Sequence, residues 1–176
     1  DTMGLHLRAW QHAFKTHGAS FEYTREIFMR LAGVGHADTV RKMNERYGDH
    51  LDPEAVTHAK EAWYAPHIEE VQPIAPMVDY VKQLHARGAK MAVASGGSRT
   101  QVQRTLKAIG LGDILSQIAS QDDITRSKPD PEIFLLAAKL IGVAPENCVV
   151  FEDSPLGIEG AEAAGMDWVQ IPQTDY

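Results

Sequence analysis

The sequence of 176 residues has a single cysteine, Cys148, which excludes an internal disulfide and any multi-cysteine zinc site. Because Cys148 lies in an apolar run that continues to Phe151, we expect it to be a small, buried side chain. No apolar run approaches the roughly 20 residues that span a bilayer, and the first residues do not resemble a secretory signal. These absences predict a cytoplasmic protein without a membrane partner.

Positive charge is also scarce, with 17 Lys and Arg against 24 Asp and Glu and a net charge of -7. No run of basic residues is present, so the composition disfavours a nonspecific nucleic-acid binder. An anionic substrate would therefore need local cations or a metal. The chain is 44% apolar and 23% charged, which is typical of a protein with a folded core.

The first part of the sequence has a helical pattern. Apolar residues recur three or four positions apart from Leu5 to about Val71, and no strand is evident there. Asp52 precedes Pro53 and is expected to cap a helix that runs on towards Glu70.

A proline-rich connection, residues 72–76, then interrupts the helical pattern. We therefore expect a helical domain at 1–73 and an α/β domain at 74–176. In the second domain, helices are expected to alternate with short apolar strands, which predicts a parallel sheet with its site at the carboxyl ends of the strands. The expected strands are 90–94, 118–119, 147–151 and 168–171, and the expected helices are 77–86, 99–109, 131–141 and 156–164.

Three loops that follow the expected strands carry groups suited to phosphate. Ser95, Gly96 and Gly97 precede a helix start, where a hydroxyl and backbone N–H groups can bind an anion. The same residues also fit an ordinary Gly-Gly turn with a serine cap. In the second loop, Pro129 and Pro131 follow Lys128 and restrict the backbone that presents it. A rigidly presented ammonium suits charge neutralisation of a phosphoryl group, although an isolated lysine of this kind is often only a solvated surface residue.

The third loop places Glu152 and Asp153 at the end of an apolar strand, before a helix that begins with Pro155. Adjacent carboxylates repel each other unless a cation lies beside them, and oxygen ligands with a phosphate partner favour Mg²⁺. Alternatively, Asp153 caps the helix while Glu152 faces water.

Together, the segments S-G-G-S-R, S-K-P-D-P-E-I-F and V-F-E-D-S-P-L-G resemble the second, third and fourth motifs of the haloacid dehalogenase (HAD) superfamily phosphatases. They are most similar to the subgroup of β-phosphoglucomutases and sugar-phosphate phosphatases. The resemblance implies an α/β fold: a Rossmann-like parallel-sheet core with an inserted helical-bundle cap that closes over the substrate. It covers essentially the whole chain.

The resemblance also implies residue roles. Ser95, with the amides of Gly96 and Gly97, would bind the phosphoryl group, and Lys128 would balance its charge. Asp153 would ligate Mg²⁺ directly, with Glu152 as a ligand or a supporting partner. His6 matches a histidine of the cap linker that can contact substrate, although a lone helical histidine is more often structural.

The family's first motif, D-x-D-G-T, carries the nucleophilic aspartate and the acid/base aspartate. Asp1 and Thr2 resemble the dipeptide that follows this motif, so the nucleophile and the first strand are expected upstream of residue 1. Loss of a central strand would leave two unpaired edges and an open core. The expected partner is a small phosphorylated metabolite, and the protein is expected to be a monomer or a weak oligomer.

Three functions remain open. The first is Mg²⁺-dependent hydrolysis of a sugar or polyol phosphate through an aspartyl-phosphate intermediate. The second is a β-phosphoglucomutase, and the third is an inactive relative that binds a phosphorylated metabolite. In the mutases, the segment matching residues 31–36 carries a lysine and an arginine for the second phosphate. Because Ala32 and His36 stand at those positions, the resemblance favours a phosphatase. A dehalogenase would not need Glu152 and Asp153.

Overall fold

The computed structural model describes residues 2–32 and 34–172, so the prediction for Asp1 lies outside the described residues. The described residues divide into two compact units, one before and one after the boundary between Val71 and Gln72. Among the described residues, none of the helices combines the length and the apolar character needed to cross a membrane.

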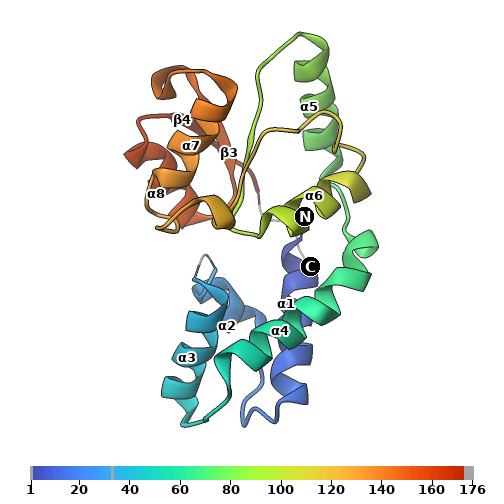
Figure 1. Ribbon diagram of the computed structural model, residues 1–176, viewed down its shortest axis with the longest axis vertical. Helices are drawn as coiled ribbons and strands as arrows, with labels where there is room; N and C mark the ends of the chain where they lie inside the picture. The colour runs from blue at the N-terminus through green and yellow to red at the C-terminus, as the bar shows by residue number, and fades with distance from the viewer. Residues whose placement is uncertain (1, 33, 173–176) are drawn as a thin grey trace. The chain divides into compact units, whose positions relative to one another are not determined.

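The first unit is helical, as the apolar pattern predicts, and its α-helices are labelled in Figure 1. Asp52 accepts hydrogen bonds from two backbone N–H groups and caps the fourth helix as expected. That α-helix ends at Tyr64 and continues as a 3₁₀-helix, because Pro66 has no N–H for the α-helical hydrogen bond. The elements are α1 (Met3–Thr16), α2 (Arg25–Arg30), α3 (His36–Tyr47), α4 (Pro53–Tyr64) and η1 (Ala65–Glu70).

An aromatic cluster forms the core of the helical unit. Trp10 and Phe14 stand one helical turn apart on α1, and their ring centroids lie 5.3 Å apart. Phe14 also packs against Tyr23, at 4.8 Å. Val40 and Met43 from α3 complete this core, in which each side chain is buried.

The second unit alternates helices and strands. The order agrees with the sequence pattern, but the first strand is shorter than the expected 90–94. The elements are α5 (Ala75–Ala86), β1 (Val93–Ala94), α6 (Arg99–Ala108), β2 (Ile118–Ala119), η2 (Gln121–Asp123), α7 (Glu132–Ile141), η3 (Pro145–Asn147), β3 (Val149–Glu152), α8 (Pro155–Ala163) and β4 (Asp167–Gln170).

The strands form two parallel pairs where the sequence predicts one sheet. Val93 pairs with Ile118 in the β1–β2 pair, and Val149 pairs with Asp167 in the β3–β4 pair. Within residues 2–32 and 34–172, β1 has only β2 as a hydrogen-bonded neighbour, and β3 has only β4. The parallel direction is as predicted, while the inner edges of β1 and β3 are not joined to each other.

Two apolar clusters support the two strand pairs. One packs α6 against β2 through Val102, Leu106 and Ile118. The other gathers side chains of α7 and α8, including Phe134 and Ala161, against β2 and β3. Because the second cluster contacts β2 of one pair and β3 of the other, the two pairs belong to one packed unit.

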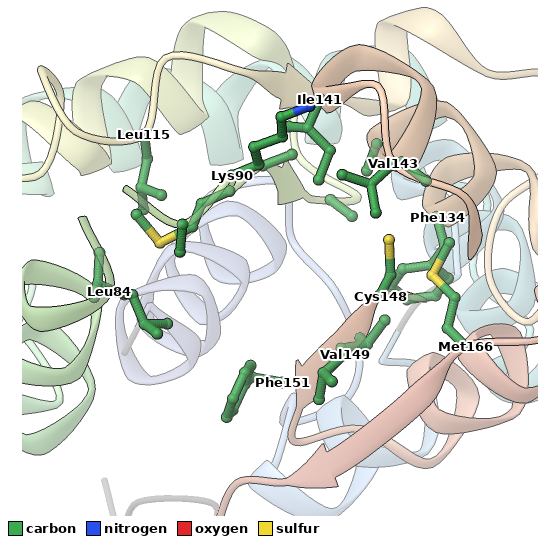
Figure 2. A pocket seen from close by; sticks show the side chains of 18 of the residues that line it. Leu84, Lys90, Leu115, Phe134, Ile141, Val143, Cys148, Val149, Phe151 and Met166 are labelled. Carbon is green, nitrogen blue, oxygen red and sulfur yellow. The ribbon is translucent and has the colours of Figure 1, made fainter. Parts of the chain in front are cut away.

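An apolar groove of about 770 Å³ lies between β1 and β3 (Figure 2). Its lining includes Leu84 from α5, Leu115 near β2, and Val149 and Phe151 from β3. Val149 is 52% exposed and Phe151 is 38% exposed, which is unusual for apolar side chains of an α/β core.

The expectation that Cys148 is buried is wrong. Its side chain lines the same groove and is only half-buried. The apolar run around Cys148 does form a strand, but the edge of β3 that faces the groove has no strand beside it among the described residues. The apolar run therefore predicts the strand correctly, but it does not predict how far Cys148 is buried.

Candidate active site

The candidate site centres on an ion pair between Lys128 and Glu152. The Lys128 Nζ atom lies 2.7 Å from Glu152 Oε2, and the two side chains are 16% and 11% exposed. Lys128 comes from the loop before α7, whereas Glu152 ends β3. The fold thus joins two of the loops that the sequence singles out, although they are 24 residues apart.

Hydrogen bonds also hold the second oxygen of Glu152. Its Oε1 accepts hydrogen bonds from the Ser154 hydroxyl at 2.8 Å and from the Ser154 N–H at 3.1 Å. Desolvation acts to raise the pKa of Glu152, but Lys128 and these hydrogen bonds outweigh it and lower the pKa below its usual value. Glu152 is therefore an anion whose two oxygens are both engaged.

Asp153 occupies a different electrostatic environment from its neighbour. Desolvation raises the pKa of Asp153, and the nearby negative charge of Glu152 raises it further. A cation beside Asp153 would offset both effects, so Asp153 is the carboxylate best suited to hold a metal ion. The described residues contain no group of three or more His, Cys, Asp and Glu side chains arranged around a metal, so such an ion would need further ligands.

Two glycines of α8 allow the site to pack closely. A β-carbon on Gly157 would overlap the side chain of Glu152, and one on Gly160 would lie 3.0 Å from the Phe134 ring and 3.2 Å from the Pro129 carbonyl oxygen. The Phe134 ring lies 4.9 Å from Lys128 Nζ. Helix α8 can therefore approach both the Glu152 carboxylate and the Lys128 loop.

The loop after β1 has the predicted turn. Ser95 donates its N–H to the Ala119 carbonyl, and its hydroxyl oxygen accepts from the Gly97 N–H at 3.2 Å. Ser98 caps α6 by accepting from the Gln101 N–H at 3.3 Å. Space beside Gly96 is open, since a β-carbon there would meet no atom within 4 Å. The structural role of this turn is shown, and its role in binding phosphate stays a prediction.

His6 belongs to the helical unit, which also contains a buried lysine, Lys60, that the sequence analysis missed. The His6 ring stacks on Tyr64 at 4.3 Å, and Lys60 Nζ lies 3.3 Å from His36 Nε2. Lys60 is fully buried. Its position one turn after Val56 and one turn before Tyr64, both buried, was the sequence signal that could have shown it.

Burial lowers the pKa of all three bases, and the charge of Lys60 lowers those of the two histidines further. Desolvation lowers the pKa of His36 to about 4, with a further contribution from Lys60. Desolvation also lowers the pKa of Lys60 to about 8, and burial lowers that of His6 well below 6.5. At neutral pH, His6 and His36 are therefore uncharged.

Comparison with known proteins identifies the family. Residues 1–171 match the family described as haloacid dehalogenase-like hydrolase. The chain belongs to this family. It is 34% identical over 173 residues to fructose-1-phosphate phosphatase YqaB of Escherichia coli (strain K12), covering 97% of this chain and 89% of that protein. It is 26% identical to the β-phosphoglucomutase of Bacillus subtilis (strain 168), covering 98% of this chain and 78% of that protein.

A solved structure supports the same haloacid dehalogenase-like fold. The crystal structure of CbbY from Rhodobacter sphaeroides in complex with phosphate matches with a TM-score of 0.85 and 26% identity. The match covers 99% of this chain and 81% of that one. The family and the fold predicted from the sequence motifs are thus confirmed, while the roles of Ser95, Lys128, Glu152, Asp153 and His6 within this haloacid dehalogenase-like chain stay proposals.

Proposed function

We propose that the protein is a magnesium-dependent phosphatase that hydrolyses a small phosphate monoester, such as a sugar or polyol phosphate. The observation that carries this proposal is the Lys128–Glu152 pair at 2.7 Å, with Asp153 beside it at the carboxyl end of β3. A protein that is 34% identical is named as a fructose-1-phosphate phosphatase, which favours a sugar phosphate as substrate.

Each residue has a distinct role in this proposal. The Lys128 ammonium neutralises charge on the transferring phosphoryl group, and the nearby ring of Phe134 and the carboxylate of Glu152 limit its motion. The Ser95 hydroxyl and the Gly96 amide donate hydrogen bonds to the phosphoryl oxygens, and the Gly97 amide, which donates to the Ser95 oxygen in this structure, turns to the phosphoryl group when it binds. The ammonium, the hydroxyl and the amide N–H groups all donate hydrogen bonds, which suits a phosphate because its oxygens are acceptors.

Asp153 is the proposed direct ligand of Mg²⁺. Its carboxylate is half-buried and next to another carboxylate, which fits an oxygen-ligated divalent cation. The oxygens of Glu152 already accept hydrogen bonds from Lys128 and Ser154, so Glu152 suits contact with water around the ion better than direct ligation. When bound, Mg²⁺ would supply positive charge beside the phosphate.

The nucleophilic carboxylate is proposed to lie on a strand upstream of residue 1. The groove between β1 and β3 supports this, because it is apolar and each of these strands has no hydrogen-bonded neighbour on the groove side among the described residues. A strand parallel to both would end near the carboxyl ends of β1 and β3, where Ser95 follows β1 and Glu152 ends β3. A carboxylate at that end would therefore meet the phosphate-binding groups.

The test compares the chain extended upstream with residues 1–176. The extended protein should release phosphate from sugar or polyol phosphates only with Mg²⁺, and residues 1–176 should be inactive. Lys128→Ala and Asp153→Ala should each lower kcat by on the order of 10²–10³, and His6→Ala should affect kcat much less. Full turnover in chelator, or turnover by residues 1–176 alone, would contradict the proposal. An inactive extended protein would favour the binding relative.

The second candidate is a mutase, because the chain resembles a β-phosphoglucomutase. Such an enzyme must hold a second phosphate, which requires permanent cations. Ala32 supplies none, and His36 lies 3.5 Å from Glu61 and 3.3 Å from Lys60, with its pKa lowered. These contacts favour the phosphatase. With β-glucose 1-phosphate and a trace of bisphosphate, we expect free phosphate, and rapid formation of glucose 6-phosphate would support the mutase.

A further inference from the structure

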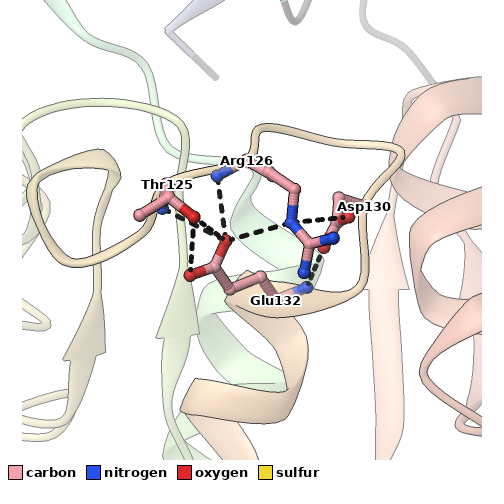
Figure 3. Close-up of polar contacts among 4 residues, drawn as sticks. All are labelled: Thr125, Arg126, Asp130 and Glu132. Atoms are coloured by element: carbon pink, nitrogen blue, oxygen red, sulfur yellow. Dashed lines mark hydrogen bonds and ion pairs between the residues drawn. The ribbon is translucent and has the colours of Figure 1, made fainter.

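Glu132, the first residue of α7, holds the start of the loop that carries Lys128 through hydrogen bonds (Figure 3). Glu132 Oε2 accepts the backbone N–H groups of Thr125 at 3.1 Å and Arg126 at 2.9 Å. The Thr125 hydroxyl lies 3.3 Å and 3.1 Å from the two carboxylate oxygens. One carboxylate thus fixes two successive peptide units just before Lys128.

The first turn of α7 also holds the end of the loop, through hydrogen bonds that involve Asp130. Asp130 Oδ1 accepts the Glu132 N–H at 3.0 Å, and the Asp130 N–H donates to the Ser127 carbonyl at 3.1 Å. Arg126 Nε lies 3.1 Å from Asp130 Oδ2 and 3.8 Å from Glu132 Oε2. Both sides of Lys128 are consequently tied to one turn of helix.

The side chain of Lys128 depends on this anchoring. A lysine has four rotatable side-chain bonds, and ordering its ammonium costs considerable entropy. Here the ammonium meets both the Phe134 ring, on the helix that Glu132 begins, and the Glu152 carboxylate. A shift of the loop backbone relative to α7 would move the ammonium away from both.

We propose that Glu132 is a positioning residue for Lys128, acting through the backbone of Thr125 and Arg126. This proposal rests on the proposed function for its kinetic consequences. An acid in the first turn of a helix also stabilises the helix through its dipole. That effect needs only the charge, whereas the Glu132 carboxylate turns back onto two named N–H groups and a hydroxyl. Glu132→Asp keeps the charge but shortens the reach, and Glu132→Gln keeps the reach but weakens the acceptor.

The first test is a double-mutant cycle in the upstream-extended enzyme. Glu132→Gln should lower kcat roughly tenfold to a hundredfold with little change in KM, since small displacements of a catalytic group have effects of this size. In the Lys128→Ala background, Glu132→Gln should lower kcat less than twofold. Glu132→Asp should restore only part of the loss.

The control is Asp123→Asn. Asp123 also accepts a backbone N–H, that of Ser120, and pairs with Arg99 at 2.7 Å, but it belongs to a different loop. Its effect on kcat should be the same with Lys128 or with Ala at position 128. Equal effects of Glu132→Gln in both backgrounds would overturn the proposal and leave Glu132 a purely structural residue.

The second test does not depend on activity. In ¹⁵N-detected spectra of lysine ammonium groups, the Lys128 signal, assigned by its absence in Lys128→Ala, should show restricted motion in the wild-type chain. Glu132→Gln should make this signal as mobile as those of exposed lysines, and Asp123→Asn should not. An unchanged Lys128 signal in Glu132→Gln overturns the proposal. An inactive wild-type enzyme with the expected spectra overturns the proposed function alone.

Discussion

Gly157 lies so close to Glu152 that a β-carbon at position 157 would overlap the Glu152 carboxylate. At this position helix α8 therefore has no side chain between its backbone and the Glu152 carboxylate, which pairs with Lys128. Gly157 lies in the first turn of α8, although glycine is less favourable than alanine in a helix interior by roughly 1 kcal/mol. Close approach to Glu152 is the physical reason for it.

Gly157→Ala should displace Glu152 and lower kcat of the upstream-extended enzyme roughly tenfold to a hundredfold. Circular dichroism should show that the fold is kept. Gly112→Ala is the matched control, because its β-carbon would meet only ordinary contacts at 3.5 Å or more, and it should leave kcat unchanged. Normal turnover by Gly157→Ala would show that the position of Glu152 is not needed.

Cys148 offers a chemical test of the groove between β1 and β3. In residues 1–176 its thiol should react with a maleimide, and in the upstream-extended chain the reaction should be at least about tenfold slower, because a strand would cover it. Desolvation, with a contribution from Glu146, raises the pKa of the thiol, so both rates are best measured at mildly alkaline pH.

The control for this measurement is Glu146→Cys in a Cys148→Ser background. Residue 146 is exposed and does not line the groove, so this thiol should react equally fast in both chains. Equal reactivity of Cys148 in both chains would show that no upstream strand occupies the groove.

The stability of the helical unit should fall with acidification. Both His6 and His36 have pKa values below 6.5 in the folded state, so the unfolded state binds more protons as pH falls. Their stabilising contribution is complete above about pH 6.5 and is lost as pH falls through about 4, the pKa of His36. Thermal unfolding between pH 7 and pH 4 should therefore show a falling Tm.

The fluorescence of Trp10 and Trp63 in a Trp168→Phe variant would report on the helical unit alone. His36→Leu should flatten the pH dependence, whereas His58→Gln, which changes an exposed histidine of α4, should not. A Tm that is constant over this range would contradict the expected protonation of the buried histidines.

Replacement of Lys60 tests the coupling among the buried bases. Lys60→Met keeps an unbranched side chain, one atom shorter, and removes the charge. The pKa of His36 should therefore rise, because one of its two lowering causes is gone. Histidine NMR titration measures this directly. Desolvation alone would then keep the His36 pKa below 6.5, and an unchanged value would show that Lys60 has no electrostatic effect on it.

The sequence alone determined the order of helices and strands and the family. Apolar periodicity located the helices of the second unit and marked the first as helical, and Asp52 marked the start of α4. These features are local, because capping and periodicity involve residues within a few turns. The three loops with groups suited to phosphate were recognisable for the same reason, since each is a short contiguous segment.

Only the tertiary structure determined which side chains meet. It brought Lys128 to Glu152 across 24 residues of sequence, and it placed Lys60 against His36 inside the helical core. It also left Cys148 in a groove, although its sequence environment is that of a core strand. Burial depends on which strands pair and which helices cover them. Strand pairing and helix coverage depend on packing between segments that are distant in the sequence, so local periodicity does not predict them.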